Sequence, residues 1–240
     1  MPLLAVKLDS ATWLREGKRD KSPDPAQLAV LAEQGGADAI VAQLTTSRRH
    51  IRERDIFILK EVVKTRFIVE TQPDENLLQI VLEARPYMVT FVSENQMDSN
   101  IREPLDYGIA ADRLAEATER LRGAGVISSH LIRPQPEAVK NAARAKAEFV
   151  EICTSELMNA ASTGEAEAQL GDIDRAGQLA GKLGMGVNCG GGLGYKNARS
   201  IAEIQLVQQI VIGRAIIKRA MLVGIERAVS QMREEITRRV

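Results

Sequence analysis

The residues whose types and spacing best suit chemistry are glycines that interrupt an apolar stretch, GMGVNCGGGLGY (184–195). Glycines let backbone N–H groups approach an anion closely, and a helix start adds a favourable partial positive charge. A second stretch, VIGRA (211–215), places an arginine where a helix is expected to begin, and its guanidinium can hold phosphate oxygens. Together the stretches predict a phosphate site, although the glycines alone would equally suit a tight turn. The residues assigned to this site are Gly191, Gly192, Gly213 and Arg214.

Two charged side chains lie at the ends of apolar runs and are candidates for catalysis. Glu70 ends RFIVE, and a carboxyl group in partly apolar surroundings can act as an acid or a base. The alternative is a structural carboxylate that pairs with a nearby arginine or lysine. Lys7, between Val6 and Leu8, could bind an anion or form a Schiff base with a carbonyl group. A salt bridge from Lys7 to Asp9 or Glu70 is the simpler alternative, so we favour a non-covalent role for the lysine.

Histidines and cysteines are few, which restricts the chemistry. His50 belongs to a basic group, RRH (48–50), that precedes a predicted helix and could hold a second anion or simply be solvated. His130 lies inside an apolar run and is expected to be a hydrogen-bonded core or rim residue. Cys153 and Cys189 fit small packing residues better than nucleophiles or a disulfide framework. No third ligand clusters with either histidine, so neither a metal site nor a cofactor is predicted.

The elements that must position these residues follow one repeated pattern, in which a short apolar run precedes a longer amphipathic one. Asp24 and Pro25 suit the start of the first such helix, and Gly35-Gly36 its end. The longest irregular stretch, residues 93–108, has the length of a lid or a ligand-binding loop. The predicted strands are 3–8, 39–44, 66–70, 87–92, 126–132, 148–154, 185–190 and 205–213. The predicted helices are 22–38, 51–65, 74–84, 110–125, 136–147, a segment ending near 181, 195–204 and 214–236.

Strict alternation of this kind implies a parallel sheet, because parallel neighbours need crossover helices. Eight units predict an α/β protein with a single (β/α)8 TIM barrel over residues 1–240, and an open doubly wound sheet is the alternative. Barrel chemistry lies at the carboxyl ends of the strands, and phosphate often binds after strands seven and eight, where the two glycine stretches fall. Further polar residues expected at this mouth are Gln43, Thr45, Asn100, Ser129, Glu151, Thr154 and Asn188.

Composition excludes several classes of protein. Lys+Arg and Asp+Glu both number 32, so the net charge is zero and a general attraction to nucleic acid or to an anionic membrane is not expected. The sequence shows neither a long apolar span nor a signal peptide, and two isolated cysteines fit reduced thiols. These features predict a cytoplasmic protein. Some amphipathic helices, such as 109–122 and 214–236, could carry subunit interfaces or simply cover the barrel.

The order of motifs resembles the pyridoxine 5'-phosphate synthase family over nearly the whole chain. The resemblance implies a (β/α)8 barrel that joins 1-deoxy-D-xylulose 5-phosphate to 3-amino-2-oxopropyl phosphate, releasing water and phosphate, and that commonly assembles as a homo-octamer. Both implied substrates are phosphorylated small molecules, which agrees with two anion-binding regions. The motifs are LDSATWLR (8–15), SPDPAQLAVLAEQGGADAI (22–40), SRRHIRERDI (47–56), Glu70, FVEICT (149–154), GVNCGGGLGY (186–195) and IGRAII (212–217).

The resemblance carries over to some site residues. It implies that Glu70 transfers protons, that His50 contacts the deoxyxylulose phosphate, and that Gly192 and Gly213 hold the phosphate of the amino ketone. Asp9 also matches a family site position.

Other site positions depart from the family pattern, and they fall at the expected mouth. Gln43 and Gly191 stand where the family has histidines that transfer protons, and Thr45 where it has a substrate-binding arginine. The first strand ends in Lys7-Leu8-Asp9-Ser10 instead of N-x-D-H. The remaining departures are Lys18 for arginine, Asn100 for threonine and Arg214 for histidine.

These departures leave three hypotheses open. The first is a divergent enzyme that binds phosphorylated keto or amino-keto substrates and performs a related condensation, lyase or isomerisation reaction. The second is a non-catalytic paralogue that binds a phosphorylated ligand or serves assembly. The third is the family reaction carried out with rearranged groups. General acid–base groups are worth roughly 10²–10⁴-fold each, so the loss of two should remove most ring-closing activity.

Overall fold

The computed structural model describes residues 1–15, 21–48, 50–93 and 102–238. Eight parallel strands form a closed barrel in sequence order, with β8 paired to β1, which confirms the predicted (β/α)8 architecture. An open sheet, the alternative, is thereby excluded. The strands are β1 (Leu3–Lys7), β2 (Ala39–Leu44), β3 (Arg66–Thr71), β4 (Met88–Phe91), β5 (Ile127–Ile132), β6 (Phe149–Cys153), β7 (Gly186–Gly190) and β8 (Val207–Ile212).

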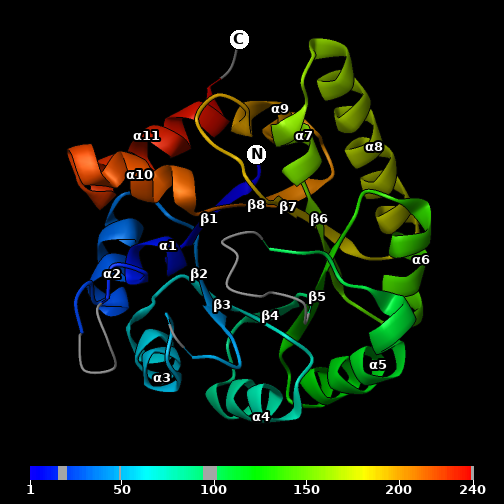
Figure 1. The fold of residues 1–240 in the computed structure, drawn as a ribbon, viewed down its shortest axis with the longest axis horizontal. Coiled ribbons are helices and arrows are strands. Elements are labelled where there is room, and N and C mark those ends of the chain that lie inside the picture. Colours follow the sequence, from blue (N-terminus) through cyan, green and yellow to red (C-terminus); the bar gives the residue numbers. More distant parts are fainter. Residues whose placement is uncertain (16–20, 49, 94–101, 239–240) are drawn as a thin grey trace.

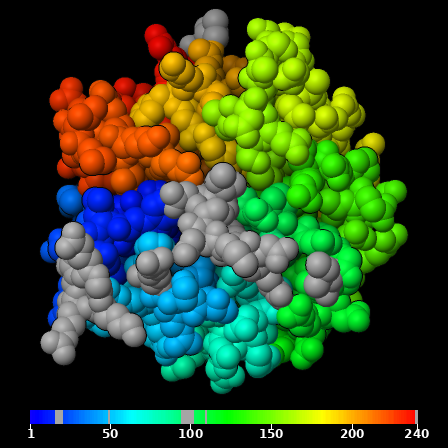
Figure 2. Space-filling model, viewed as in Figure 1, coloured from blue at the N-terminus to red at the C-terminus, as the bar shows by residue number. Residues whose placement is uncertain are grey.

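Helices surround the barrel as an outer ring, which α10 and α11 complete beside α2 (Figure 1). Side chains fill the gaps between the ribbons and give a continuous outer surface (Figure 2). In the described part of the chain, no helix is long and apolar enough to cross a membrane. The helices are α1 (Asp9–Thr12), α2 (Pro25–Gln34), α3 (Glu53–Val62), α4 (Glu75–Ala84), α5 (Tyr107–Gly123), α6 (Pro136–Arg144), α7 (Ser155–Asn159), α8 (Thr163–Lys182), α9 (Ala198–Ala202), α10 (Arg214–Val223) and α11 (Ile225–Thr237).

The strands are apolar on both faces because the helices cover one face and the barrel interior the other. The outward-facing side chains join the helices in the main core, whereas a smaller cluster that includes Ala5, Val41 and Ile68 fills the barrel interior. Register then decides which polar groups share a level at the mouth. Gln43 is opposite Glu70 across β2 and β3, so both side chains enter the barrel at its carboxyl end.

Helix boundaries mostly follow local signals in the sequence. The Asp24 carboxylate accepts a hydrogen bond from the Ala26 N–H at 3.0 Å, which confirms the predicted start of α2. The predicted helix 214–236 is wrong, because Gly224, with φ 84° and ψ 157°, divides it into α10 and α11. The segment after β6 is likewise two helices, α7 and α8. Helix α1 forms within a stretch that the sequence pattern left as a loop.

Candidate functional site

A cavity of about 430 Å³ opens at the carboxyl ends of the strands. It brings together residues from the loop after β1, from β2, from the segment before α5, and from the loops after β6, β7 and β8. This is the end of the barrel at which the fold places its chemistry. Among the described residues, its lining comprises Lys7, Asp9, Ser10, Trp13, Gln43, Arg102, Ser155, Met158, Asn159, Gly191, Gly192, Leu193, Val211, Gly213, Arg214, Ala215 and Lys218.

One side of the cavity contains all four residues assigned to phosphate. Gly191 and Gly192 have φ of 116° and 77°, a conformation that glycine adopts without steric cost. Gly213 precedes α10, and Arg214 is the first residue of that helix. The first N–H groups of a helix lack intrahelical acceptors, so those of α10 are available to an anion. Lys218, which sequence reasoning did not identify, adds a second cation from the next turn of the helix.

A buried network of charges also borders the cavity, and its Lys7 side chain lies next to Gly213. The Lys7 ammonium donates to Gln43 Oε1 at 2.9 Å and also to Glu70, and it lies 3.8 Å from Asp9 Oδ2. The lysine thus forms the salt bridge that the sequence left as an alternative to a reactive amine. Arg102 Nη1 donates to Glu70 Oε1 at 2.6 Å and to Glu151. One carboxylate, Glu70, therefore contacts both cations.

The three buried carboxyl groups of this network respond differently to their surroundings. Burial alone would raise the pKa of Glu70, but Arg102 and Lys7 outweigh it and hold that pKa below its ordinary value. Burial raises the pKa of Glu151 even though Arg102 opposes it, and Glu70 adds to the rise. Burial also raises the pKa of Asp9, against the effect of Lys7. Glu70 is accordingly the most readily ionised of the three, while Glu151 and Asp9 hold a proton more readily.

Glu70 and Glu151 lie behind the two cations. Lys7 and Arg102 line the cavity, whereas Glu70 is fully buried and in contact with both of them. A molecule that enters the cavity meets the cations first. Asp9 is different, because it lines the cavity itself and its Oδ1 accepts the Gln43 backbone N–H at 2.7 Å. Its Oδ2 is buried without a hydrogen-bond partner among the described residues, so it can accept a hydrogen bond from a ligand.

His50 lies at the rim of this site. Its ring packs against that of Trp13 with centroids 5.2 Å apart, and Trp13 lines the cavity. Arg15 fixes this corner, because its guanidinium donates to the His50 carbonyl at 3.3 Å and to Asp55 at 2.6 Å. His50 is therefore held beside the cavity, on the side of β1 and β2. Two other predicted binding residues, Lys18 and Asn100, lie outside the described residues.

Arg102 is the main residue that sequence reasoning missed. It belongs to the long segment between β4 and α5, for which the sequence predicts a lid or a ligand-binding loop. Its guanidinium is buried between Glu70 of β3 and Glu151 of β6, which are 32 and 49 residues away in sequence. A basic residue in a loop of that kind was the available signal, but no motif surrounds it. Trp13 was also missed, although it lies within the motif LDSATWLR (8–15).

His130 and the cysteines occupy the positions expected of packing residues. His130 is buried in the shell, where Nδ1 lies 2.8 Å from Tyr107 Oη and Nε2 3.0 Å from Thr118 Oγ1. Burial lowers the pKa of His130 to about 3, so the imidazole is neutral. Cys153 and Cys189 are buried free thiols. Within the described ranges, no group of three or more histidine, cysteine or acidic side chains could hold a metal ion.

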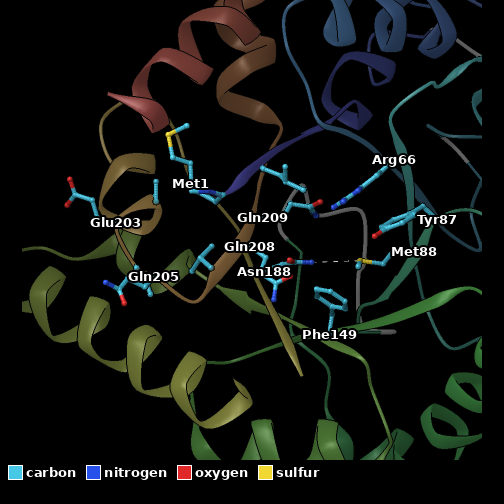
Figure 3. A pocket seen from close by; sticks show the side chains of 15 residues that line it. Met1, Arg66, Tyr87, Met88, Phe149, Asn188, Glu203, Gln205, Gln208 and Gln209 are labelled. Carbon is cyan, nitrogen blue, oxygen red and sulfur yellow. Dashed lines mark hydrogen bonds between the residues drawn. The ribbon is translucent and has the colours of Figure 1, made fainter. Parts of the chain in front are cut away.

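A second cavity, of about 640 Å³, lies at the opposite pole of the barrel (Figure 3). It corrects one expectation, because Asn188 faces this pole rather than the mouth. Its amide lies 3.8 Å from the Met88 sulfur, and Phe149 and Gln209 lie nearby (Figure 3). Asn188 is two residues before the end of β7, and its level in the barrel is below that of Gly190. The amino ends of the strands are not where barrels carry out chemistry, so this cavity is not the candidate site.

Comparison of the fold with solved structures gives only the architecture. The structure matches KGPDC from Streptococcus mutans with a TM-score of 0.67 and 13% identity, covering 99% of this chain and 98% of that one. It matches thiamine phosphate pyrophosphorylase from Pyrococcus furiosus with a TM-score of 0.65 and 14% identity, covering 98% and 95%. Identities this low establish a shared barrel and nothing finer.

Comparison of the sequence is more specific. The family model for pyridoxal phosphate biosynthesis protein PdxJ matches residues 4–238. Pyridoxine 5'-phosphate synthase of Geotalea uraniireducens is 37% identical over 232 residues, which is 97% of each chain. The synthase of Citrifermentans bemidjiense is 38% identical over 234 residues, or 98% of each chain. With this identity and coverage, the chain belongs to the PdxJ family of pyridoxal phosphate biosynthesis proteins.

Proposed function

We propose that the protein binds a phosphorylated keto or amino-keto small molecule at the carboxyl mouth of the barrel and catalyses a condensation or lyase-type reaction related to that of its family. One observation carries this proposal: Gly191, Gly192, Gly213 and Arg214 line the same cavity as Lys7. The phosphate would bind between the glycine loop and the start of α10, where the first backbone N–H groups of the helix and the Arg214 guanidinium, which lines the cavity, would hold it.

The other end of the bound molecule would meet the buried charges. Lys7, held by Gln43 and Glu70, would act as an electrostatic clamp on developing negative charge. Glu70 would serve as the acid or base once Lys7 or Arg102 shifts to expose it. Asp9 would orient the ligand through Oδ2, and Glu151 would support Arg102. His50 would hold a second anionic group from the rim.

Two alternatives remain as proposals of lower rank. A protein that only binds a phosphorylated ligand would use the same cavity, because the phosphate positions are independent of the proton-transfer groups. The family reaction itself would require other groups to act in place of the two histidines that Gln43 and Gly191 replace. Turnover with the family substrates separates these alternatives, and its expected result is given in the Discussion.

We further propose that the protein forms a homo-oligomer, as the resemblance to an octameric family implies. Met221 and Leu222, near the end of α10, are 72% and 79% exposed, which is unusual for adjacent large apolar side chains. A second copy of the chain would cover them. Light scattering coupled to gel filtration should give a mass several times 26.3 kDa, and a monomer would contradict the proposal.

The phosphate site can be tested by replacing Arg214 with alanine. Titration calorimetry with inorganic phosphate should show binding weakened by ~1.5–3 kcal/mol, the usual worth of a hydrogen bond to a charged group. Arg227→Ala is the matched control, because this exposed arginine lies on α11 and does not line the cavity. Trp13 is the chain's only tryptophan and lines the cavity, so its fluorescence offers a second readout. If the wild type, Arg214→Ala and Arg227→Ala bind phosphate with equal affinity, Arg214 does not contact the phosphate and the site lies elsewhere.

A further inference from the structure

The inner wall of the cavity is formed by a guanidinium group. Arg102 lines the cavity and its side chain is 9% exposed, whereas its two glutamate partners are buried and do not line the cavity. The hydrogen bonds to Glu70 and Glu151 both leave from Nη1. Nε and Nη2 carry three further N–H donors, for which the described part of the chain supplies no acceptor. These donors are available to a ligand.

Gly190 provides the space that this guanidinium occupies. A Cβ atom at Gly190 would lie 2.4 Å from Arg102 Nη2 and 2.3 Å from Glu151 Oε1, which is too close for any side chain. Nη2 therefore lies directly over the end of β7, one residue before the glycines of the phosphate side. A ligand with its phosphate at Gly191 and Gly192 would extend its next carbon atoms toward Nη2.

The charges at this wall restrict what can bind there. Lys7 and Arg102 present N–H donors to the cavity, and the glutamates that balance their charge are behind them. An ammonium group at this place would be repelled by two cations at short range. A carbonyl oxygen would accept hydrogen bonds from both, and charged donors make the stronger hydrogen bonds.

We propose that Arg102 is a specificity-determining residue that binds the carbonyl oxygen of a phosphorylated ketone. This inference rests on the proposed function and assigns a residue to the recognition of its keto group: the carbonyl of the ligand is oriented toward Lys7 and Arg102. The guanidinium would also stabilise negative charge that develops on that oxygen during a reaction. The guanidinium of Arg102 therefore supplies electrophilic assistance at a mouth where Gln43 and Gly191 carry no imidazole.

The test compares two ligands that differ only at the carbonyl group. Dihydroxyacetone phosphate and sn-glycerol 3-phosphate have the same phosphate and the same carbon count, and one is the ketone of the other. Calorimetry on the intact protein should show that the ketone binds about tenfold more tightly or better, as expected for a hydrogen bond to a charged donor. The measured quantity is the ratio of the two dissociation constants. Both ligands carry the same phosphate group, so its contribution to affinity cancels in this ratio.

Two variants then test whether Arg102 causes this ratio. Gly190→Ala displaces the guanidinium without removing a charge, and Arg102→Lys keeps the charge but loses the fork of donors. Both variants should bring the ratio of the two dissociation constants to within about twofold of one, while the affinity for glycerol 3-phosphate changes little. Gly181→Ala is the matched control, because its Cβ would make only ordinary contacts with Leu206 at 4.0 Å. Thermal unfolding of each variant checks that it is folded.

The outcomes separate this inference from the proposed function. A wild-type protein that binds both ligands equally, or a ratio that persists in both Gly190→Ala and Arg102→Lys, would overturn the role of Arg102 and leave the phosphate site intact. A wild-type protein that binds neither ligand nor inorganic phosphate would refute the proposed function, and the inference with it. A ratio lost in both variants and kept in Gly181→Ala supports it.

Discussion

Supplied with 1-deoxy-D-xylulose 5-phosphate and 3-amino-2-oxopropyl phosphate, the protein should form pyridoxine 5'-phosphate at least about 10⁴-fold more slowly than its Geotalea relative. The family resemblance implies imidazoles at two positions where this chain has Gln43 and Gly191. A positioned general acid or base contributes roughly 10²–10⁴-fold, so two losses multiply to that deficit or more. Chromatographic detection of the product under saturating substrates, with both enzymes side by side, measures the ratio.

Three of the described groups in or near the mouth are unsuited to replace the missing imidazoles. The Gln43 amide accepts a hydrogen bond from Lys7 and cannot titrate. The neutral His130 is held in the shell by Tyr107 and Thr118, away from the cavity. Burial raises the pKa of the Cys189 thiol, which therefore remains protonated and unreactive at neutral pH.

A single histidine would not repair the glycine loop. Gly191 has φ of 116°, which side-chain-bearing residues rarely adopt, and a Cβ there would lie 3.3 Å from the Cys153 sulfur and from the Thr154 nitrogen. The loop geometry is thus adapted to the absence of a side chain.

In the turnover experiment, phosphate binding measured on the same preparation guards against an inactive sample. Turnover within about tenfold of the relative would show that other groups perform the proton transfers.

The barrel was predictable because most strands are short, mainly apolar runs bounded by turn residues. Residues 39–44 were predicted as a strand and form β2 with the same bounds. Such runs are buried on both faces in a closed parallel sheet, so the pattern that predicts a strand also predicts its surroundings. Gly224 shows the limit of this reasoning. The sequence analysis extended one helix through this glycine, but its backbone, with φ 84° and ψ 157°, ends α10 and begins α11.

The positions of site residues were predictable where the barrel topology determines them. They were not predictable where the conformation of a loop determines them. The carboxyl ends of β7 and β8 are neighbours in any such barrel, so the glycines and Arg214 were expected to meet. Arg102 contacts Glu70 and Glu151 from residues 102–106, which form neither helix nor strand before α5. Local sequence does not fix that path, because it depends on the space left by Gly190 and on two partners distant in sequence.

Replacing Arg102 with alanine should lower the free energy of unfolding by about 3–5 kcal/mol at neutral pH, because Glu70 and Glu151 would remain buried without their shared partner. Arg120→Ala is the matched control. Arg120 also pairs with a glutamate, at 2.6 and 3.1 Å from Glu75, but the two side chains are 32% and 69% exposed. Solvent screens such a pair, and its loss should cost less than about 1 kcal/mol. Urea unfolding gives both values.

The pH dependence distinguishes lost pairing from lost packing. In the wild type, the lowered pKa of Glu70 contributes stability above its unfolded pKa, and this stability is lost as the pH falls through the folded pKa. The raised pKa of Glu151 works in the opposite sense, because its proton uptake on folding makes stability fall as the pH rises.

Without Arg102, both carboxyl groups bind protons more readily in the folded state. The difference in stability between wild type and Arg102→Ala should therefore be largest at neutral pH and shrink toward the acid limb. A difference that stays constant with pH would mean that the guanidinium acts by filling space, and that its pairing with the two glutamates contributes little.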